Sequence, residues 1–222
     1  MEKQVKLIYS LRFIKMKKTF DRFKEVTTLY EEKALGEDDI VIYKRFNDVT
    51  FSDEIKFFSF DNVEFINCKF EGNIKNSVFH NVKFEKCEMS NITLEKCGIQ
   101  KCLFDGCHMI GISFLDSNIK NSDFVNSNMM MCNISGVTLK LDIFENVKMT
   151  SATITNLSFD DLILNEVDLS ESEFYKTSLF GLNLTNSTID GIVLESMDLL
   201  RGVIVNELQA LDFINLLGII IK

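Results

Sequence analysis

Several features that would assign this 222-residue protein to a familiar functional class are missing from its sequence. No uninterrupted apolar run approaches the ~20 residues of a membrane-spanning helix, and Arg12 interrupts the only candidate core of a signal peptide. The 2 histidines, His80 and His108, have no nucleophile triad or metal-ligand spacing near them. We therefore expect a cytoplasmic protein with no membrane partner, no catalytic residues, no metal and no cofactor.

The 6 cysteines lack the tight paired spacing of a structural zinc site. Each lies two residues before a large apolar residue, at a position that elsewhere holds Val, Ser, Ala or Thr. The six are Cys68, Cys87, Cys97, Cys102, Cys107 and Cys132. A position shared by small residues predicts an inward site where cysteine packs as a compact apolar side chain. Free thiols of this kind suit a reducing compartment.

Basic side chains are scarce in the second half of the chain. The formal net charge is -9, yet residues 1–45 carry 11 basic and 8 acidic side chains. Residues 102–200 carry only 4 lysines against 14 Asp and Glu. This stretch should repel nucleic acid and attract basic surfaces, so we expect no direct nucleic-acid binding.

What the sequence does contain is a repeat of five residues nested in a repeat of twenty. From Ile74 to Leu199, every fifth residue is a large apolar one. A helix would rotate such side chains by 140° per repeat and a strand would alternate their faces, so the chain must turn a corner every five residues. Phe recurs every twenty residues, and five residues later Met recurs as well. The pattern predicts a solenoid with four-sided coils.

Two register slips extend this repeat toward the N-terminus. The apolar positions shift by one residue before Ile55 and again before Ile74, which predicts two coils of nineteen residues. With these slips, one Phe per coil falls in a single column, and the Met residues form a column beside it. We expect a stacked, dry core ladder made of Phe46, Phe65, Phe84, Phe104, Phe124, Phe144, Met89, Met109, Met129 and Met149.

Corner residues and one exception follow from the same spacing. Asn or Gly recurs two residues after many of the apolar positions, as at Asn121 and Gly136, and both types tolerate the positive φ of a tight corner. Asp142 interrupts the pattern because it occupies an inward position. Burying a lone carboxylate is costly, so we expect either a local bulge or an Asp142 that accepts hydrogen bonds from backbone amides.

Three regions are predicted: residues 1–45, 46–201 and 202–222. The first is an arm or cap in which Thr19 to Leu35 follow the spacing of an amphipathic helix. It could cover the end of the solenoid or bind a partner. The second is the solenoid of about eight coils.

Residues 202–222 form a helix with Asn206 as its N-cap, followed by a short strand. This segment is too apolar for a simple cap, and we expect a homodimer through it, with a self-contained cap as the alternative. The predicted dimer interface is Leu208, Leu211, Phe213, Ile214, Leu216, Leu217, Ile219, Ile220 and Ile221.

Good copies of the five-residue unit are Cys132-Asn133-Ile134-Ser135-Gly136 and Leu182-Asn183-Leu184-Thr185-Asn186. This unit resembles the pentapeptide-repeat family over residues 46–201. The resemblance implies an all-β fold, a right-handed quadrilateral β-helix. The N-terminal helical arm and the C-terminal helix are predicted from the residue spacing alone, and the arm is an addition to the pattern of the family. The tail further resembles the dimer module of the quinolone-resistance subgroup, whose members are acidic dimers that bind type II topoisomerases as DNA mimics.

Two functions remain open. A dimeric DNA mimic that binds DNA gyrase or topoisomerase IV is one, because residues 102–200 would carry -10 over about 24 Å, where duplex DNA carries about -14. The other is a structural or protein-interaction rod with an unrelated partner, whose acidic side chains serve solubility. The predicted partner-binding acidic face is Asp160, Asp161, Glu166, Asp168, Glu171, Glu173, Asp190, Glu195 and Asp198.

Overall fold

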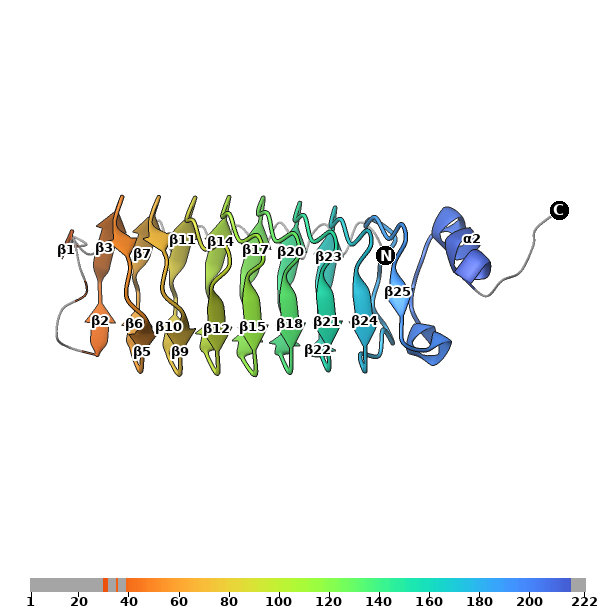
Figure 1. The fold of residues 1–222 in the computed structure, drawn as a ribbon, viewed down its shortest axis with the longest axis horizontal. Coiled ribbons are helices and arrows are strands. Elements are labelled where there is room, and N and C mark those ends of the chain that lie inside the picture. Colours follow the sequence, from red (N-terminus) through yellow and green to blue (C-terminus); the bar gives the residue numbers. More distant parts are fainter. Residues whose placement is uncertain (1–29, 32–34, 36–38, 217–222) are drawn as a thin grey trace.

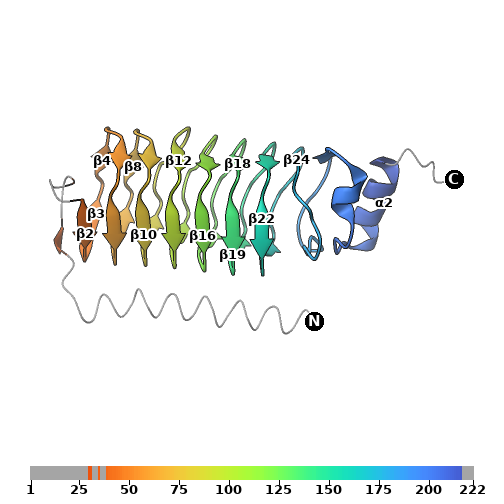
Figure 2. The ribbon, with the colours of Figure 1, turned by 90° about the horizontal axis from the view of Figure 1, so that it is seen from below.

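The described part of the chain is a solenoid whose stacked coils form a rod (Figures 1 and 2). A computed structural model describes residues 30–31, 35 and 39–216. Every described strand pair is parallel, and each strand pairs with the strand one coil before or after it. The predicted solenoid with four-sided coils is therefore confirmed.

Three sides of the rod are parallel sheets, which we call A, B and D. Sheet A comprises β1 (Tyr30–Glu31), β3 (Lys44–Asn47), β7 (Glu64–Ile66), β11 (Lys83–Glu85), β14 (Leu103–Asp105), β17 (Asp123–Val125), β20 (Ile143–Glu145) and β23 (Ile163–Asn165). Sheet B comprises β2 (Ile40–Ile42), β6 (Ser59–Asp61), β10 (Val78–His80), β13 (Gly98–Gln100), β16 (Asn118–Lys120), β19 (Thr138–Lys140) and β22 (Ser158–Asp160). Sheet D comprises β5 (Ile55–Lys56), β9 (Ile74–Lys75), β12 (Thr93–Glu95), β15 (Ser113–Leu115), β18 (Asn133–Ser135), β21 (Thr153–Thr155), β24 (Glu173–Tyr175) and β25 (Val193–Leu194).

The fourth side is narrower. It contains the pair β4 (Thr50–Phe51) and β8 (Lys69–Phe70), and it continues as single parallel bridges from Lys69 to Thr188. The Met column is part of the inward face of this side, and Met89, Met109, Met129 and Met149 are all buried. The predicted packing of this column is confirmed.

The Phe column and its two slips are confirmed as well. Phe46 pairs with Phe65 and Phe65 with Phe84 over nineteen residues, whereas Phe84 pairs with Phe104 over twenty. Ring centroids are 5.1 Å apart across the two nineteen-residue coils. They are 4.6 Å apart in each later pair down to Phe144, and all five ring pairs are nearly parallel. A coil of twenty residues thus brings the rings closer to the strand spacing of about 4.8 Å.

The inward position two residues before each Phe, Met, Ile or Leu has a role that the sequence pattern did not reveal. Where a hydroxyl occupies it, that hydroxyl accepts a hydrogen bond from the backbone amide one coil earlier. The Cys102 amide donates to Ser122 Oγ at 3.1 Å, and the Ala152 amide donates to Ser172 Oγ at 3.1 Å. The small residues at this position therefore link the coils as well as fill space.

Asp142 lies at this same inward position, two residues before Phe144, and also accepts a hydrogen bond from the backbone amide one coil earlier. Its side chain is fully buried. The Ser122 amide donates to Oδ1 at 2.7 Å, and the Lys140 amide donates to Oδ2 at 2.6 Å. The second of the two predicted arrangements, a carboxylate that accepts backbone hydrogen bonds, is therefore confirmed, and it offsets part of the cost of burial.

The corners have the backbone conformation that their sequence predicts. Asn121 has a φ of 52° and Gly136 a φ of 65°. The corner amide donates to the following coil, as from Asn121 N to the Lys140 carbonyl at 2.8 Å. Asn186 is an exception, because it is absent from the positive-φ residues of the described chain. Side chains other than Asn also adopt this conformation, including Glu166 and Glu171, at a steric cost that the repeated hydrogen bonds compensate.

The ends of the solenoid differ from the predicted boundaries. β2 already pairs with β6, and Tyr30 and Glu31 pair with β3, so stacking begins before residue 46. Because Tyr30 and Glu31 form a strand, the helix predicted through Leu35 is wrong at its C-terminal end, and the rest of that prediction lies outside the described residues. At the other end, Asn183 still bridges Ile204.

A short 3-10 helix, η1 (Met197–Leu200), and one α-helix, α2 (Glu207–Leu216), close the C-terminal end (Figure 1). Asn206 is the N-cap of α2 as predicted: the Gln209 amide donates to its Oδ1 at 3.0 Å, and its own amide donates to Gln209 Oε1 at 2.9 Å. Gln209 Nε2 also donates to the carbonyls of Leu184 and Ser187, at 2.8 and 2.7 Å. This buried amide therefore anchors α2 to the last coil. Neither described helix is long and apolar enough to cross a membrane.

Candidate partner-binding surface

The predicted acidic residues lie outside the core because of their positions in the repeat. Asp161, Glu166 and Glu171 are corner residues with positive φ, and all three are exposed. Asp160, Asp190, Glu195 and Asp198 are also exposed, whereas Asp168 and Glu173 are half-buried. The structure therefore presents all nine carboxylates at the surface of the last three coils.

These carboxylates do not form one flat face. Five of them belong to the fourth side and to sheet D, and these five are Asp168, Glu171, Glu173, Asp190 and Glu195, which we call the main acidic cluster. The Glu171 amide donates to the Asp190 carbonyl at 2.8 Å, so these two residues lie on adjacent coils. Asp160 and Asp161 lie at the corner between sheets B and A instead. The sequence analysis predicted which acidic residues lie at the surface, but not that they are distributed around the rod rather than on one face.

Local hydrogen bonds hold several of these carboxylates in place. Glu195 accepts from the Lys176 amide at 2.8 Å, and Asp168 Oδ1 accepts from Ser170 Oγ at 2.6 Å. Glu173 accepts from the Tyr175 hydroxyl at 2.9 Å, and this carboxylate raises the pKa of Tyr175 above its ordinary value. A partner would therefore meet acidic groups with limited freedom of movement, which lowers the entropy lost on binding.

Ion pairing differs between the two halves of the rod. In the coils before residue 102, lysines pair with glutamates along one strand, as in Lys69–Glu71 and Lys83–Glu85, or between adjacent coils, as in Lys75–Glu54. Among the described residues after 102, the ion pair is Lys140–Asp160 at 2.9 Å. Most of the described carboxylates in the last coils thus form no ion pair with a lysine of the described chain, and this asymmetry favours a basic partner at that end.

A groove of about 540 Å³ adjoins Asp160 and Asp161. Its described lining includes Phe159, Leu162 and Phe180, and Phe180 is 69% exposed. The spacing of the repeat predicts that Phe180 points outward but does not indicate a groove beside it. The combination of an apolar floor and two carboxylates suits a partner side chain that is both apolar and basic.

Helix α2 divides the predicted dimer residues into two sets. Phe213 is buried in the core of its own chain, at 8% exposure, and Ile214 is half-buried. Leu208 and Leu211 point outward, at 75% and 42% exposure. The side chain of Leu216 is not described, and Leu217, Ile219, Ile220 and Ile221 lie outside the described residues. Within the described part, Leu208 and Leu211 are thus the residues that an isologous contact would use.

The histidines and cysteines lie in surroundings that suit a structural role. His80 Nδ1 lies 2.7 Å from Asp61 Oδ1 on the surface of sheet B, and His108 is exposed on the fourth side. All six cysteines are buried as predicted, and burial raises the pKa of Cys97 to about 11 and that of Cys132 to about 12. Such thiols are protonated and poorly reactive. Within the described residues, no group of three His, Cys, Asp or Glu side chains could hold a metal ion.

Comparison with known proteins agrees with this architecture. Residues 77–154 match the model of the pentapeptide repeat region. The predicted resemblance to the pentapeptide-repeat family is confirmed. No curated protein matches the chain.

Several solved structures of pentapeptide-repeat type are similar to this chain. One is a trypsin-treated QnrB1, a plasmid-mediated fluoroquinolone resistance protein, with 16% identity, 82% of this chain and 98% of that chain covered, and a TM-score of 0.42. Another is HetL from the cyanobacterium Nostoc, involved in the regulation of heterocyst differentiation, with 11% identity, coverage of 73% and 90%, and a TM-score of 0.31. A third is Rfr23 from the cyanobacterium Cyanothece, with 10% identity, coverage of 76% and 92%, and a TM-score of 0.26.

Proposed function

We propose that this protein is a non-enzymatic dimer that binds DNA gyrase or topoisomerase IV through its acidic C-terminal coils and thereby modulates quinolone sensitivity. The supporting observation is the asymmetry of charge: among the described residues, most carboxylates around the last coils have no lysine partner, and they lie next to an α2 whose Leu208 and Leu211 are exposed. A protein whose surface carries a charge per unit length of the order of that of duplex DNA is suited to a basic DNA-binding surface.

The distribution of the carboxylates around the rod is compatible with mimicry of a DNA duplex. Because the main acidic cluster spans two sides of the rod, it resembles the round cross-section of a duplex more than a flat plate. Two copies joined through α2 would place their acidic coils on both sides of the contact. A longer rod with continuous negative charge at its centre would result.

A supercoiling assay tests the proposal. We expect the purified protein, at micromolar concentration or below, to reduce supercoiling by its cognate gyrase or to rescue that activity from a quinolone. Combined Glu171→Gln, Asp190→Asn and Glu195→Gln substitutions should weaken this effect at least about tenfold, because each removes a charge that faces the partner. Absence of any effect of the native protein in both assays would sink the topoisomerase proposal.

A matched control removes three exposed carboxylates from the other end of the rod: Asp48→Asn, Asp53→Asn and Glu71→Gln. This variant has the same net charge as the first but keeps the main acidic cluster. It should act like the native protein. If both variants lose the effect equally, total charge rather than this cluster is responsible.

Dimer formation is tested separately. We expect Leu208→Asp together with Leu211→Asp to convert a dimer into a monomer in sedimentation, because both side chains are exposed in the single chain and a charge there opposes an apolar contact. Phe213→Asp would be a poor test, since Phe213 belongs to the core of its own chain. A native protein that sediments as a monomer would refute the dimer.

A rod that binds some unrelated partner is the second candidate. Ile110 and Met130 lie next to each other on the fourth side, where the Gly111 amide donates to the Met130 carbonyl at 2.8 Å, and Met131 at the adjoining corner is 61% exposed. Val125, which also occupies an outward position in the repeat, is buried on sheet A and does not belong to this area. This small apolar area favours a protein contact independent of the carboxylates.

A further inference from the structure

The backbone ladder that joins the coils is interrupted after β22 and β23. In the ordinary arrangement, a strand amide donates to the coil before it, as from Ser158 to the Val137 carbonyl at 3.0 Å. Ser178 occupies the equivalent place one coil later. No backbone hydrogen bond joins residues 178–185 to residues 157–165, although the structure describes every residue of both segments. We call this interruption on sheets B and A the split.

The other two sides hold the same two coils together. On the fourth side, the Thr188 amide donates to the Val167 carbonyl at 2.9 Å, and on sheet D, β24 pairs with β25. The ladder resumes beyond the split, where the Leu184 amide donates to the Ile204 carbonyl at 2.8 Å. The split is therefore a local opening between two coils that stay attached, and not the end of the solenoid.

The split coincides with two large side chains at positions that hold smaller ones in the coil before. These inward positions, two residues before an apolar centre, carry Val137 and Asp142 in that coil and Leu157 and Leu162 here. Leu182 then follows Leu162 in the same column. Extra volume in a closely packed interior forces backbone shifts, so the next coil does not close against these leucines.

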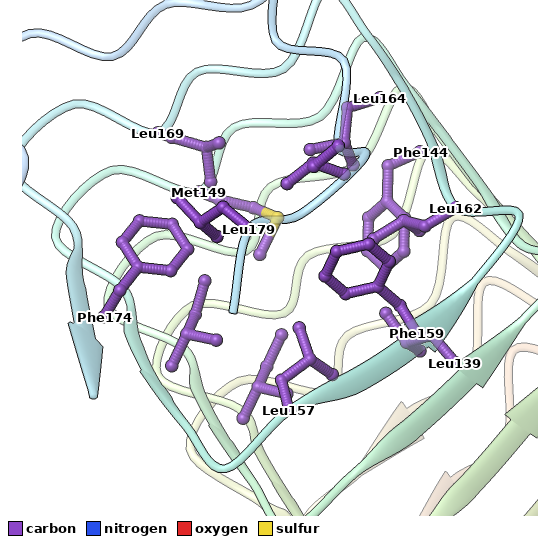
Figure 3. Close-up of a pocket in the computed structure, with 13 residues that line it drawn as sticks. Leu139, Phe144, Met149, Leu157, Phe159, Leu162, Leu164, Leu169, Phe174 and Leu179 are labelled. Atoms are coloured by element: carbon purple, nitrogen blue, oxygen red, sulfur yellow. The ribbon is translucent and has the colours of Figure 1, made fainter. Parts of the chain in front are cut away.

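The interior of the rod reaches the surface at the split. Phe159, Leu162 and Leu164 point inward yet are only half-buried, and Figure 3 shows them around an apolar cavity. Phe159 and Leu162 also line the groove beside Asp160 and Asp161. The groove therefore leads into the apolar interior. Its volume of about 540 Å³ is within the range of about 300–1,000 Å³ that is typical of small-molecule sites.

The inner and outer parts of this site differ in polarity. Among the described residues, only Ile, Leu, Phe and Met side chains line the cavity. The rim carries acceptors instead: Asp160, which pairs with Lys140 at 2.9 Å, and Asp161, which forms no ion pair within the described chain. The Phe180 amide donates within its own coil, so the Phe159 carbonyl accepts no backbone hydrogen bond from that coil.

These features select one class of ligand. An apolar chain fits the interior, and a primary ammonium group, which has three donors and no acceptor, complements the carboxylates and carbonyls of the rim. A lysine side chain of a partner protein would enter with its charged end first and place that charge among apolar side chains, which is costly. A free alkylamine enters with its apolar end first and keeps its charge beside Asp161. The geometry therefore favours a small molecule over a protein side chain.

We propose that the split is a binding site for a small amphiphilic amine, with its apolar chain between the two coils and its ammonium group at Asp161. The chain of the ligand packs on Phe159 and Leu162, and its ammonium group donates to the acceptors of the rim. The ligand thereby supplies part of the contact that the two coils do not make with each other on sheets B and A.

Titration of the full-length protein with n-hexylammonium, followed by methyl NMR, tests this proposal. The methyl signals of Leu157, Leu162 and Leu164 should shift, whereas those of Leu94, which is buried in a closed coil, should not. Hexylammonium should bind at least about tenfold more tightly than hexanoate, which has the opposite charge on a chain of the same length. Leu164→Phe, which fills part of the cavity, should weaken the binding of hexylammonium at least about fivefold.

Asp161→Asn separates the effect of charge from that of shape. It should reduce the preference for hexylammonium over hexanoate to about threefold or less. Asparagine suits this corner because Asn121 holds the equivalent corner two coils earlier, also with a positive φ. The control, Asp116→Asn, removes the same charge from an exposed corner of a closed coil and should keep the full preference.

Three results would overturn the inference. Absence of any leucine methyl shift at millimolar hexylammonium would mean that the split admits no ligand. Equal affinity of the native protein for hexylammonium and hexanoate would mean that the rim does not select an amine. Shifts of Leu94 as large as those of Leu162 would mean that the amine binds without a defined site. None of these results depends on whether the protein binds a topoisomerase.

Discussion

The coils from Phe46 to Phe144 and the coils after Phe144 follow one repeat but are packed differently. In the first set, the Phe rings stack at 4.6–5.1 Å and every inward centre is buried. In the second set, Leu164 replaces the next Phe of the column, and Leu157, Phe159, Leu162 and Leu164 are only half-buried. An apolar cavity of about 30 Å³ lies among them (Figure 3).

Charge also changes along the rod, but nearer the N-terminus than packing does. The coils before residue 102 carry paired lysines and glutamates, whereas the main acidic cluster lies in the coils after Phe144. Sheet B ends at β22, and the following coil continues through turns and bridges. The coils that carry the main acidic cluster thus belong to the less closely packed part of the rod, as expected for the proposed partner contact there.

The largest effect is expected from replacing one ring of the Phe column with alanine. Phe104→Ala should lower the free energy of unfolding by about 3–5 kcal/mol, because Phe104 is fully buried between Phe84 and Phe124. Leu164→Ala should cost about 2 kcal/mol, since Leu164 is half-buried beside a cavity. Denaturant unfolding followed by circular dichroism measures both. Equal losses would mean that the two sets of coils are equally well packed.

Much of this fold could be predicted from the sequence because each coil repeats the same side-chain environments at the same spacing. A residue such as Phe84 has only one kind of environment in a four-sided coil, so its spacing determines its direction. The slips before Ile55 and Ile74 were visible for the same reason. The N-cap Asn206 was recognisable because its chemistry is local: a side-chain oxygen reaches an amide three residues later.

Features that depend on neighbouring coils or on the rest of the chain were not predictable. The burial of Val125 could not be predicted from its outward position, because the repeat determines the direction of a side chain but not what packs against it. Phe213 was predicted at a dimer contact, but an apolar helical residue packs equally well against its own last coil. The distribution of carboxylates such as Asp160 and Glu171 around the rod likewise depends on coil geometry rather than on composition.

The second test uses pH and the interior thiols of the well-packed coils. Burial raises the pKa of Cys102 from 9.0 to about 12, so the folded chain keeps this proton while the unfolded chain loses it above pH 9. Stability should therefore fall as pH rises from about 9 toward 12. Cys102→Ser should reduce the loss between pH 8 and pH 10 by about 1 kcal/mol, as measured by urea unfolding at both values.

Serine is a suitable replacement because Ser122 occupies the equivalent position one coil later. A matched control is Ser122→Ala, which perturbs the same column without removing a titrating thiol. Its loss between pH 8 and pH 10 should equal that of the native chain. If Cys102→Ser shows the full native loss as well, the thiol does not contribute to the pH dependence.

The smallest effect is expected from filling the cavity that distinguishes the terminal coils. Leu164→Phe would continue the Phe column by one ring, next to Phe144, and would occupy part of the space seen in Figure 3. A gain of about 0.5–1 kcal/mol in the free energy of unfolding is expected, because ~30 Å³ of cavity costs about 0.7 kcal/mol. The control is Ile119→Phe, which adds a ring to a fully packed coil and should cost about 1–3 kcal/mol. If both substitutions destabilise the protein, the terminal coils are already closely packed, and their looser interior does not explain why the acidic surface lies there.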